Sequence, residues 1–240
     1  MGRKKRLRRS FEGFIFSGGQ LLQWSNSSPM LALFGLMLLC VTYTNAMHVS
    51  HVSDCGKVRG CWLLPNGCKD SSDCTGIITW QHTGRSLLFE LEIDMKMKPN
   101  GVWVGLGISK DDLMGNDTVL ECQFRDKGQG SVHLSHNTKD KNLPLPEATQ
   151  ILLKDSYTEV RDDRMLCGAE WMLDAMMLHP DEKRMMHRIS AGKYHLLLAF
   201  GELGKDSEKK QHELIGEGAP WRSNGKARFC SHCPPEIVDE

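Results

Sequence analysis

A methionine on a short polar loop is the residue whose type and position most directly suggest chemistry in this sequence. Met114 lies between an apolar segment that ends at Ile108 and a second one that begins at Thr118. A thioether sulfur is a known axial ligand of haem iron. The alternative is that Met114 fills a gap at the end of a hydrophobic core, because the chain has 13 methionines and this flexible side chain packs well.

Two β-strands are predicted to position this loop. Residues 102–108 alternate valine, leucine and isoleucine with tryptophan and glycine, and residues 118–124 form a second apolar segment. Residues 85–97 show a longer alternation, with leucine, phenylalanine, isoleucine and methionine on one face and mainly charged residues on the other. Such a period of two indicates an antiparallel strand that is buried on one face. Pro99-Asn100-Gly101 predicts a turn that joins residues 85–97 and 102–108 as a hairpin.

Further short strands are predicted along the rest of the chain, at residues 131–134, 150–153, 158–161, 164–173 and 193–201. Short strands at this spacing, separated by turn residues, are typical of an all-β sandwich. Residues 174–189 allow two interpretations, a short helix after Pro180 or one irregular connection. No internal repeat and no second domain is visible in the sequence.

The cysteines predict a disulfide-bonded protein. One of the nine, Cys40, lies in an apolar segment, which leaves an even set of eight: Cys55, Cys61, Cys68, Cys74, Cys122, Cys167, Cys230 and Cys233. In an exported chain an even set predicts disulfides, although eight cysteines allow 105 connectivities and the pairing stays open. Zinc is the alternative for the Cys230/Cys233 pair and the four N-terminal cysteines, but thiolate sites need reduced cysteines, which an oxidising compartment disfavours, and the gaps between the N-terminal cysteines are longer than the usual zinc spacing.

The first 46 residues are predicted to direct export. A basic run at residues 3–9 precedes an apolar run at 30–46, and Thr44-Asn45-Ala46 suits cleavage after Ala46. The apolar run is shorter than the ~20 residues of a spanning helix. The alternative is an uncleaved type II signal-anchor, whose basic run stays inside the cell. The first interpretation predicts a secreted protein, and the second a membrane-anchored protein with a lumenal domain.

Three segments, in the same order along the chain, resemble the DOMON family of extracellular β-sandwich domains. Residues 101–122 read GVWVGLGISKDDLMGNDTVLEC, residues 165–167 read MLC, and residues 193–203 read KYHLLLAFGEL. The sequence is similar to the cytochrome domain of cellobiose dehydrogenase and to the N-terminal domain of dopamine β-monooxygenase. The resemblance covers about residues 77–222 and implies an all-β, immunoglobulin-like antiparallel β-sandwich, here with a disulfide-rich N-terminal lead.

The resemblance also implies a cofactor site. In the haem-binding branch of the family, a methionine on the loop after the first predicted strand of residues 101–122 and a histidine beyond residues 193–203 ligate one b-type haem, and these positions fall on Met114 and His212. A Met/His pair fills both axial positions and raises the reduction potential, which suits the transfer of single electrons. Trp103, Phe200 and Trp221 are the aromatic residues expected to exclude water from the haem.

The histidine ligand has alternatives on sequence grounds. The chain has ten histidines, and His212 lies in a charged run, residues 208–213, where a histidine is usually solvated. The rival ligands are His179, which precedes a proline in a loop, His187, which lies among basic residues, and His195, which alternates with apolar residues in a predicted strand.

Composition and motifs narrow the class of function. The 30 basic and 30 acidic residues cancel, and no basic stripe interleaved with aromatic residues is present, so a nucleic-acid partner is not expected. The sequence contains no Gly-rich phosphate loop, Gly-x-Ser-x-Gly elbow or His-Glu-x-x-His. Asp111 and Asp112 are adjacent on a loop and are interpreted as solvated. These observations favour a non-catalytic electron-transfer protein whose redox partner is a separate, unknown molecule. The alternative is a haem-free extracellular module that binds a sugar or a protein.

The expected organisation has four parts. Residues 1–46 are the signal peptide or signal-anchor with its basic lead, and residues 47–76 are the cysteine-rich lead. Residues 77–229 form the β-sandwich, and residues 230–240 form a C-terminal tail. Asn116-Asp117-Thr118 is a glycosylation sequon beside Met114, so Asn116 is expected to carry a glycan.

Overall fold

The computed structural model describes residues 52–240, apart from residues 126–129, 216–217, 231–232, 234–236 and 239–240. The chain divides into two units, Met1–Ala46 and Met47–Glu240, and the described residues all belong to the second. The expected signal peptide or signal-anchor therefore lies outside the described residues. Within them, no helix has the length and apolar character needed to cross a membrane.

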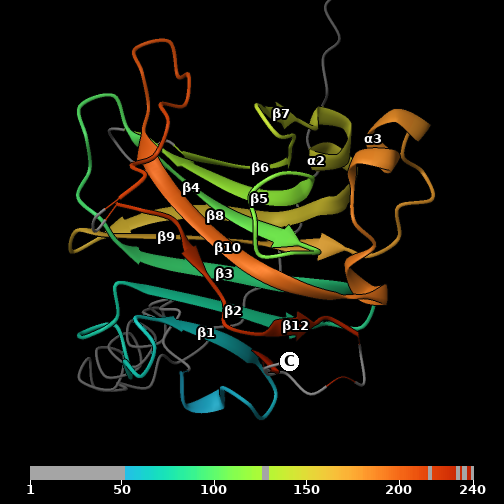
Figure 1. Cartoon of the computed structure of the whole chain (residues 1–240), viewed down its shortest axis with the longest axis horizontal. Helices are drawn as coiled ribbons and strands as arrows, with labels where there is room; N and C mark the ends of the chain where they lie inside the picture. The colour runs from blue at the N-terminus through green and yellow to red at the C-terminus, as the bar shows by residue number, and fades with distance from the viewer. Residues whose placement is uncertain (1–51, 126–129, 216–217, 231–232, 234–236, 239–240) are drawn as a thin grey trace, which may run out of the picture. The chain divides into compact units, whose positions relative to one another are not determined.

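The described strands form two antiparallel sheets that enclose one hydrophobic core (Figure 1). The first sheet has the order β1 (Gly60–Leu64), β2 (Gly76–His82), β3 (Ser86–Asp94), β9 (Arg164–Met172), β8 (Leu153–Arg161). The second has the order β13 (Ile237–Val238), β12 (Lys226–Arg228), β10 (Lys193–Glu202), β4 (Val102–Ser109), β5 (Asp117–Phe124), β6 (Gly130–Asn137), β7 (Asn142–Pro144), and β11 (Trp221–Arg222) pairs with β10. The predicted fold class, an antiparallel all-β sandwich with a disulfide-rich lead, is confirmed.

The period-two patterns identified the core faces of the two central strands correctly. In β3 the core face consists of Leu87, Phe89, Leu91 and Ile93, all at most 1% exposed. In β4 the core face consists of Val102, Val104, Leu106 and Ile108, which are fully buried. Because each such side chain contributes roughly 1.5–3 kcal/mol when it leaves water, these two faces account for a large part of the hydrophobic stabilisation.

The predicted hairpin between residues 85–97 and 102–108 is wrong. Strand β3 pairs with β2 and β9, whereas β4 pairs with β10 and β5, so residues 95–101 pass from one sheet to the other. The turn itself is present, and Gly101 has a φ of 102°, which favours glycine. A turn signal shows that the chain reverses, but not which sheet receives the next strand. Here the two apolar faces bury each other because β3 and β4 lie in opposite sheets.

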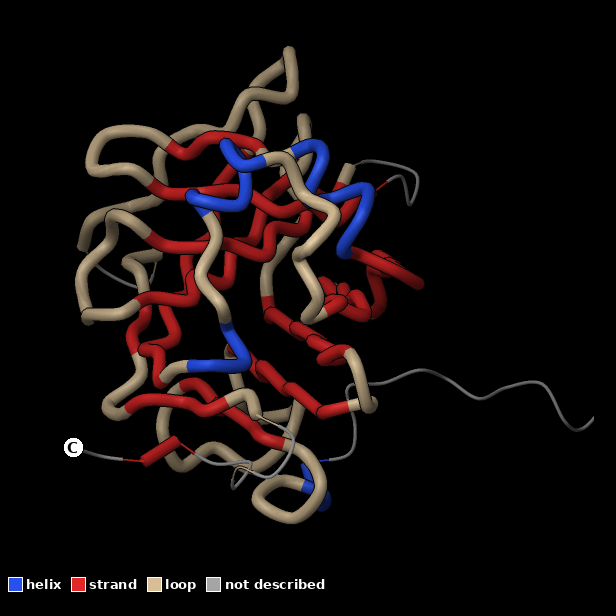
Figure 2. The backbone as a smooth tube through the Cα atoms, turned by 90° about the vertical axis from the view of Figure 1, so that its right-hand side faces the viewer, coloured by secondary structure: helices blue, strands red, loops and turns tan. Residues whose placement is uncertain are grey.

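Residues 150–153 were expected to form a strand, but they lie mostly in helix α2 (Pro146–Leu152), and β8 begins at Leu153. Pro146 suits the first helical turn, and Ala148 and Leu152, four residues apart, bury one face of the helix. After Pro180 the helical interpretation is confirmed by α3 (Pro180–Met185). The Ala148 backbone N–H donates to Glu182 of α3 at 2.7 Å. Figure 1 shows α2 and α3 together at one end of the sandwich, the end that faces the viewer in Figure 2.

All eight cysteines outside the apolar segment form disulfides, as predicted. Two of the bonds close short loops in the N-terminal lead, Cys55–Cys61 and Cys68–Cys74, and a third, Cys230–Cys233, lies near the C-terminus. The fourth, Cys122–Cys167, joins β5 in the second sheet to β9 in the first. This last bond crosses the core, where both of its cysteines are buried.

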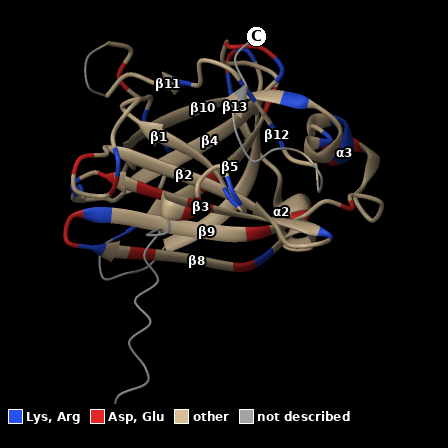
Figure 3. Ribbon diagram, turned by 90° about the horizontal axis from the view of Figure 1, so that it is seen from below, with Lys and Arg blue, Asp and Glu red and all other residues tan. Residues whose placement is uncertain are grey.

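The outer face of β3 is buried, although its charged residues predicted a solvated face. Glu92 is only 1% exposed and pairs with Arg164, which also donates to the Cys74 carbonyl at 3.0 Å. Glu90 pairs with Arg59 from the lead, and the Tyr157 hydroxyl donates to Glu90 at 3.0 Å. Burial, with the negative charge of Glu90 second, raises the pKa of Tyr157. Figure 3 shows basic and acidic residues interspersed along these strands and loops. The N-terminal lead contributes to burying the two ion pairs, through Arg59 and the Cys74 carbonyl, although the alternation in the sequence predicted that these charges are solvated.

Candidate functional site

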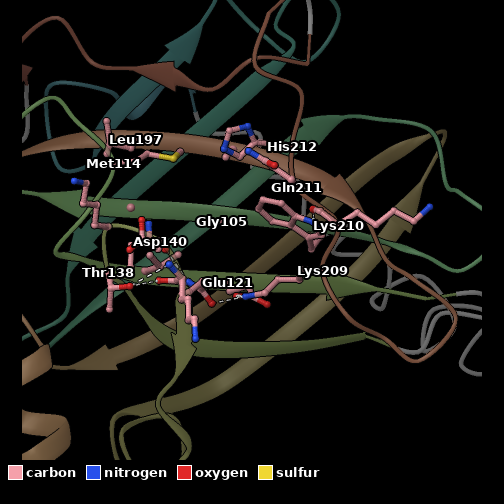
Figure 4. Close-up of a pocket in the computed structure, with 18 residues that line it drawn as sticks. Gly105, Met114, Glu121, Thr138, Asp140, Leu197, Lys209, Lys210, Gln211 and His212 are labelled. Atoms are coloured by element: carbon pink, nitrogen blue, oxygen red, sulfur yellow. Dashed lines mark hydrogen bonds and ion pairs between the residues drawn. The ribbon is translucent and has the colours of Figure 1, made fainter.

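A cavity of about 420 Å³ lies on the outer face of the second sheet, opposite the hydrophobic core (Figure 4). Strands β10, β4 and β5 form its floor, and loops beyond β4, β6 and β10 form its walls. The lining residues are Trp103, Gly105, Gly107, Met114, Val119, Glu121, Asn137, Thr138, Lys139, Asp140, Lys141, Asn142, Leu197, Ala199, Lys209, Lys210, Gln211 and His212. The volume is within the range of small-molecule sites.

Two glycines make the floor of the cavity level. Gly105 lies between Ala199 and Glu121 in the strand register, and Gly107 lies between Leu197 and Val119. A Cβ at Gly107 would lie 3.2 Å from the Leu197 Cβ, and one at Gly105 would lie 3.3 Å from Val119 Cγ1. Because neither glycine has a side chain, the backbone of β4 is bare at these two positions, next to the Trp103 ring on the same face.

Met114 reaches the cavity from the loop between β4 and β5. It is 42% exposed, so it does not fill a gap in the core, and that interpretation of the sequence is wrong. The loop returns to the sheet through Gly115, whose φ is 134° and whose N–H donates to Asp117 at 2.8 Å. Asn116, the predicted glycosylation site, is exposed in the same turn with a φ of 60°.

His212 lines the same cavity from the segment after β10. Its ring lies 6.4 Å from the ring of Trp103, centroid to centroid, and its Nδ1 lies 2.8 Å from the carbonyl oxygen of Glu213. A carbonyl oxygen only accepts hydrogen bonds, so Nδ1 is the donor in this contact, and in the neutral ring Nε2 is then the nitrogen with the lone pair. This is the tautomer in which a histidine ligates a metal through Nε2 while the backbone fixes the ring. In Figure 4 the sulfur of Met114 is directed toward the side of the cavity on which His212 lies.

One wall of the cavity is polar. The Glu121 carboxylate, only 4% exposed, pairs with Lys209, which also contacts the Asn142 side-chain oxygen. At the rim, Lys139 and Lys141 have no acidic partner among the described residues. The opposite wall and floor, with Trp103, Val119, Leu197 and Ala199, are apolar. The cavity therefore suits a ligand that combines a flat apolar surface with acidic or other polar groups.

Comparison with known proteins finds relatives that are named as DOMON proteins or as ferric-chelate reductases. It is 30% identical over 86 residues to human "DOMON domain-containing protein FRRS1L", an alignment that covers 36% of this chain and 28% of that protein. It is 26% identical over 160 residues to a Drosophila melanogaster "Putative ferric-chelate reductase 1 homolog", covering 67% of this chain and 24% of that protein. A Danio rerio "Putative ferric-chelate reductase 1" is 31% identical over 112 residues, covering 45% of this chain and 19% of that protein.

The chain resembles DOMON proteins. It covers between 19% and 28% of the length of these curated relatives. No family model matches the sequence, and no solved structure matches it. The named relatives support the family resemblance, and the cytochrome character of the chain stays a prediction.

The structure places the two predicted ligands, Met114 and His212, at one cavity, and the rival histidines lie outside that cavity. Among the described residues that line the cavity there is no His179, His187 or His195. Phe200 and Trp221, predicted to shield a haem, do not line it either and pack against the hydrophobic core. Of the three expected aromatic residues, only Trp103 is in place. Phe200 pairs with Val104 in the strand register, on the core side of the sheet.

Four residues that shape the cavity were not predicted from the sequence. Gly105 and Gly107 alternate with core residues, and glycine at every second position of a strand is a visible signal of one bare face. No pattern in the sequence marks Glu121 and Lys209. They are 88 residues apart, and a lysine in the charged run before His212 is expected to be solvated.

The environment of His187 predicts that the stability of the protein depends on pH. Its ring stacks on Tyr194, with centroids 5.6 Å apart, and burial, with Lys110 second, lowers its pKa. Asn116, Asp117 and His136 act on the same ring. Below an unfolded-state pKa of about 6.5, the unfolded chain therefore takes up a proton that the folded protein does not.

We expect the melting temperature to fall as the pH drops through this window, from about 7 toward 5. Each 1 kcal/mol lost lowers it by about 2–4 °C for a domain of this size. His187→Phe keeps the stacked ring and the backbone N–H that donates to Thr118. It should flatten the pH dependence measured by calorimetry. An unchanged slope in this variant would assign the dependence to other groups, of which His133, also with a lowered pKa, is the first to replace.

Proposed function

We propose that this protein is an extracellular DOMON protein that holds a b-type haem between Met114 and His212 and transfers single electrons. One observation carries the proposal. The two predicted ligands are far apart in the sequence and come from different loops, yet both line one cavity on a bare sheet face. A methionine that only packs, or a histidine that is only solvated, has no reason to share a cavity with the other.

The residues present fit such a group. Gly105 and Gly107 leave a level floor, and Val119, Leu197 and Trp103 supply an apolar surface that excludes water. The free Nε2 of His212 and the exposed thioether of Met114 are the two donors of a Met/His pair. Two unpaired lysines at the rim, Lys139 and Lys141, are placed to pair with acidic groups of the ligand.

The group supplies one chemical ability when it is bound, which is to take up and release one electron at a potential raised by the Met/His pair. This chain's residues hold, orient and shield it. The ferric-chelate reductase names of two relatives support a redox role, although this chain corresponds to only 24% and 19% of those proteins.

Export is part of the proposal. Disulfides persist in oxidising compartments such as the extracellular space, and the disulfides of this domain, together with the apolar segment before Met47, support secretion or a lumenal location.

A second candidate is supported by the polar wall. Asn137, Asn142 and Glu121 face the cavity on one side and Trp103 on the other. A stacking aromatic ring beside amide and carboxylate groups suits a sugar, so the alternative function is a haem-free sugar-binding module.

The deciding experiment is haem titration of protein collected from the culture medium. Its amino-terminal sequence, expected at Met47, distinguishes the cleaved form from an anchored one. We expect saturation at one haem per chain, with a Soret band and sharp α and β bands after reduction with dithionite. A protein that stays colourless at saturating haem would exclude the electron-transfer proposal and favour the sugar-binding module.

A further inference from the structure

The segment that carries His212 folds back over the sheet as an arm. This arm, residues 203–213, leaves β10 and returns to its end, where the Lys210 N–H donates to the Glu202 carbonyl at 3.0 Å. Within the arm, the Gly204 N–H donates to the Glu208 carbonyl at 2.7 Å. The His212 ring is thereby placed beside Trp103, on the floor strand β4.

Three side-chain contacts attach the arm to the sheet. The Trp103 indole N–H donates to the Lys210 carbonyl at 3.0 Å. The Lys210 ammonium pairs with Glu202 at 3.0 Å, but both side chains are about half exposed. The third contact is buried: the Lys209 ammonium reaches under the arm to the Glu121 carboxylate and the Asn142 oxygen.

The two acceptors of the Lys209 ammonium are oriented by hydrogen bonds that do not involve the lysine. The Asn142 side-chain N–H₂ donates to Ser135 at 2.9 Å and to Asn137 at 2.8 Å, which directs its oxygen to the other side. Gln123 donates to the second oxygen of the Glu121 carboxylate at 3.0 Å. Two oriented acceptors therefore converge on one ammonium group. If the arm lifts, Glu121 loses its cationic partner, and a buried charge without a partner is costly.

We propose that the Lys209–Glu121 pair is a latch that keeps the arm closed over the cavity and holds His212 in position. Lys209 is three residues before His212, so an arm that is released at Lys209 takes the imidazole away from Trp103 and opens the cavity. Glu121 and Lys209 are then positioning residues for His212. The part of this inference that concerns haem rests on the proposed function, whereas the closed arm is a property of the protein without any ligand.

The test compares two glutamates that both bind lysines of the arm. Glu121→Gln removes the buried charge without changing shape, and Lys209→Met removes the other partner. Glu202→Gln is the matched control, since it breaks the exposed pair with Lys210, and exposed pairs contribute little. In the haem-free protein we expect hydrogen exchange of the amides of residues 203–213 to accelerate at least about tenfold in the first two variants and to stay unchanged in the control.

Haem binding kinetics provide the second readout. In Glu121→Gln and Lys209→Met, association and dissociation should both accelerate, while the spectrum of the bound state stays that of the wild type. Lys209→Arg keeps the charge and should restore slow exchange. A merely structural role would lower the melting temperature without changing these rates.

Two results would overturn the latch: exchange in the arm that is unchanged in both latch variants, or exchange that accelerates equally in Glu202→Gln. Faster arm exchange in a protein that binds no haem would support the latch and reject the haem proposal, so the two failures are distinguishable. Unchanged hydrogen exchange in the amides of β9 confirms that a variant is folded. If Glu121→Gln does not fold, Lys209→Met replaces it in the test, because the Lys209 side chain is partly exposed.

Discussion

Replacing His212 with alanine is expected to abolish most haem binding by the secreted protein. The imidazole is the stronger of the two proposed ligands, and its ring is fixed by the Glu213 carbonyl and the neighbouring Trp103. Removal of a residue that only hydrogen-bonds to a metal ligand typically lowers metal affinity by about 10–100-fold. We therefore expect removal of the ligand itself to raise the dissociation constant for haem by at least about 100-fold. Titration followed at the Soret band measures it.

Met114 provides the comparison within the same site. Met114→Ala should still bind haem, because the imidazole remains, but with one axial position open and a lower reduction potential. His179→Ala is the control, since His179 is outside the cavity and its Nδ1 accepts from the Asp181 N–H at 3.4 Å. If both ligand variants keep the wild-type spectrum while His179→Ala or His187→Ala loses it, the family assignment of the histidine is wrong.

The second large effect is expected from the disulfide that joins the two sheets. Cys122 and Cys167 are separated by 45 residues, and closing a loop of that length restricts the unfolded chain by about 4 kcal/mol. We expect the double variant Cys122→Ala/Cys167→Ala to melt about 8–16 °C lower, because 1 kcal/mol corresponds to about 2–4 °C at this size. The empty space left by two buried sulfur atoms adds to the loss.

The matched control is Cys68→Ala/Cys74→Ala. Its loop spans a separation of 6 residues, so the same relation gives about 2 kcal/mol, roughly half of the effect. Differential scanning calorimetry of both double variants decides the point. Equal losses in melting temperature would show that the crossing bond contributes nothing beyond local cross-linking.

The sequence predicts this fold well where a strand has one apolar face. Residues 85–97 and 102–108 revealed their core faces because burial on one side imposes a period of two. The pairing of these strands could not be predicted, since the turn at Gly101 is compatible with either sheet. The strands β11 (Trp221–Arg222) and β12 (Lys226–Arg228) are too short to show any period.

The candidate site was predictable to a different extent. Met114 and His212 came from the family resemblance, and the structure places both at one cavity, but no local pattern marks Lys209 or Glu121. The burial of Glu92 was equally hidden, because it depends on Arg164 and on the lead that covers it. Contacts between residues far apart in the sequence decide whether a charge is solvated or paired.

The two faces of β4 serve different purposes: the inner face stabilises the fold, and the outer face, with Gly105 and Gly107, forms the floor of the cavity. Its inner residues hold the sandwich together, whereas the outer glycines contribute only backbone, so the identity of the bound molecule depends on the loops around them. Those loops can change without disturbing the core. An exchange of the segments that carry Met114 and His212 between DOMON domains should therefore transplant ligand preference onto an unchanged scaffold, and the same modularity would let relatives with this sheet diverge in what they bind.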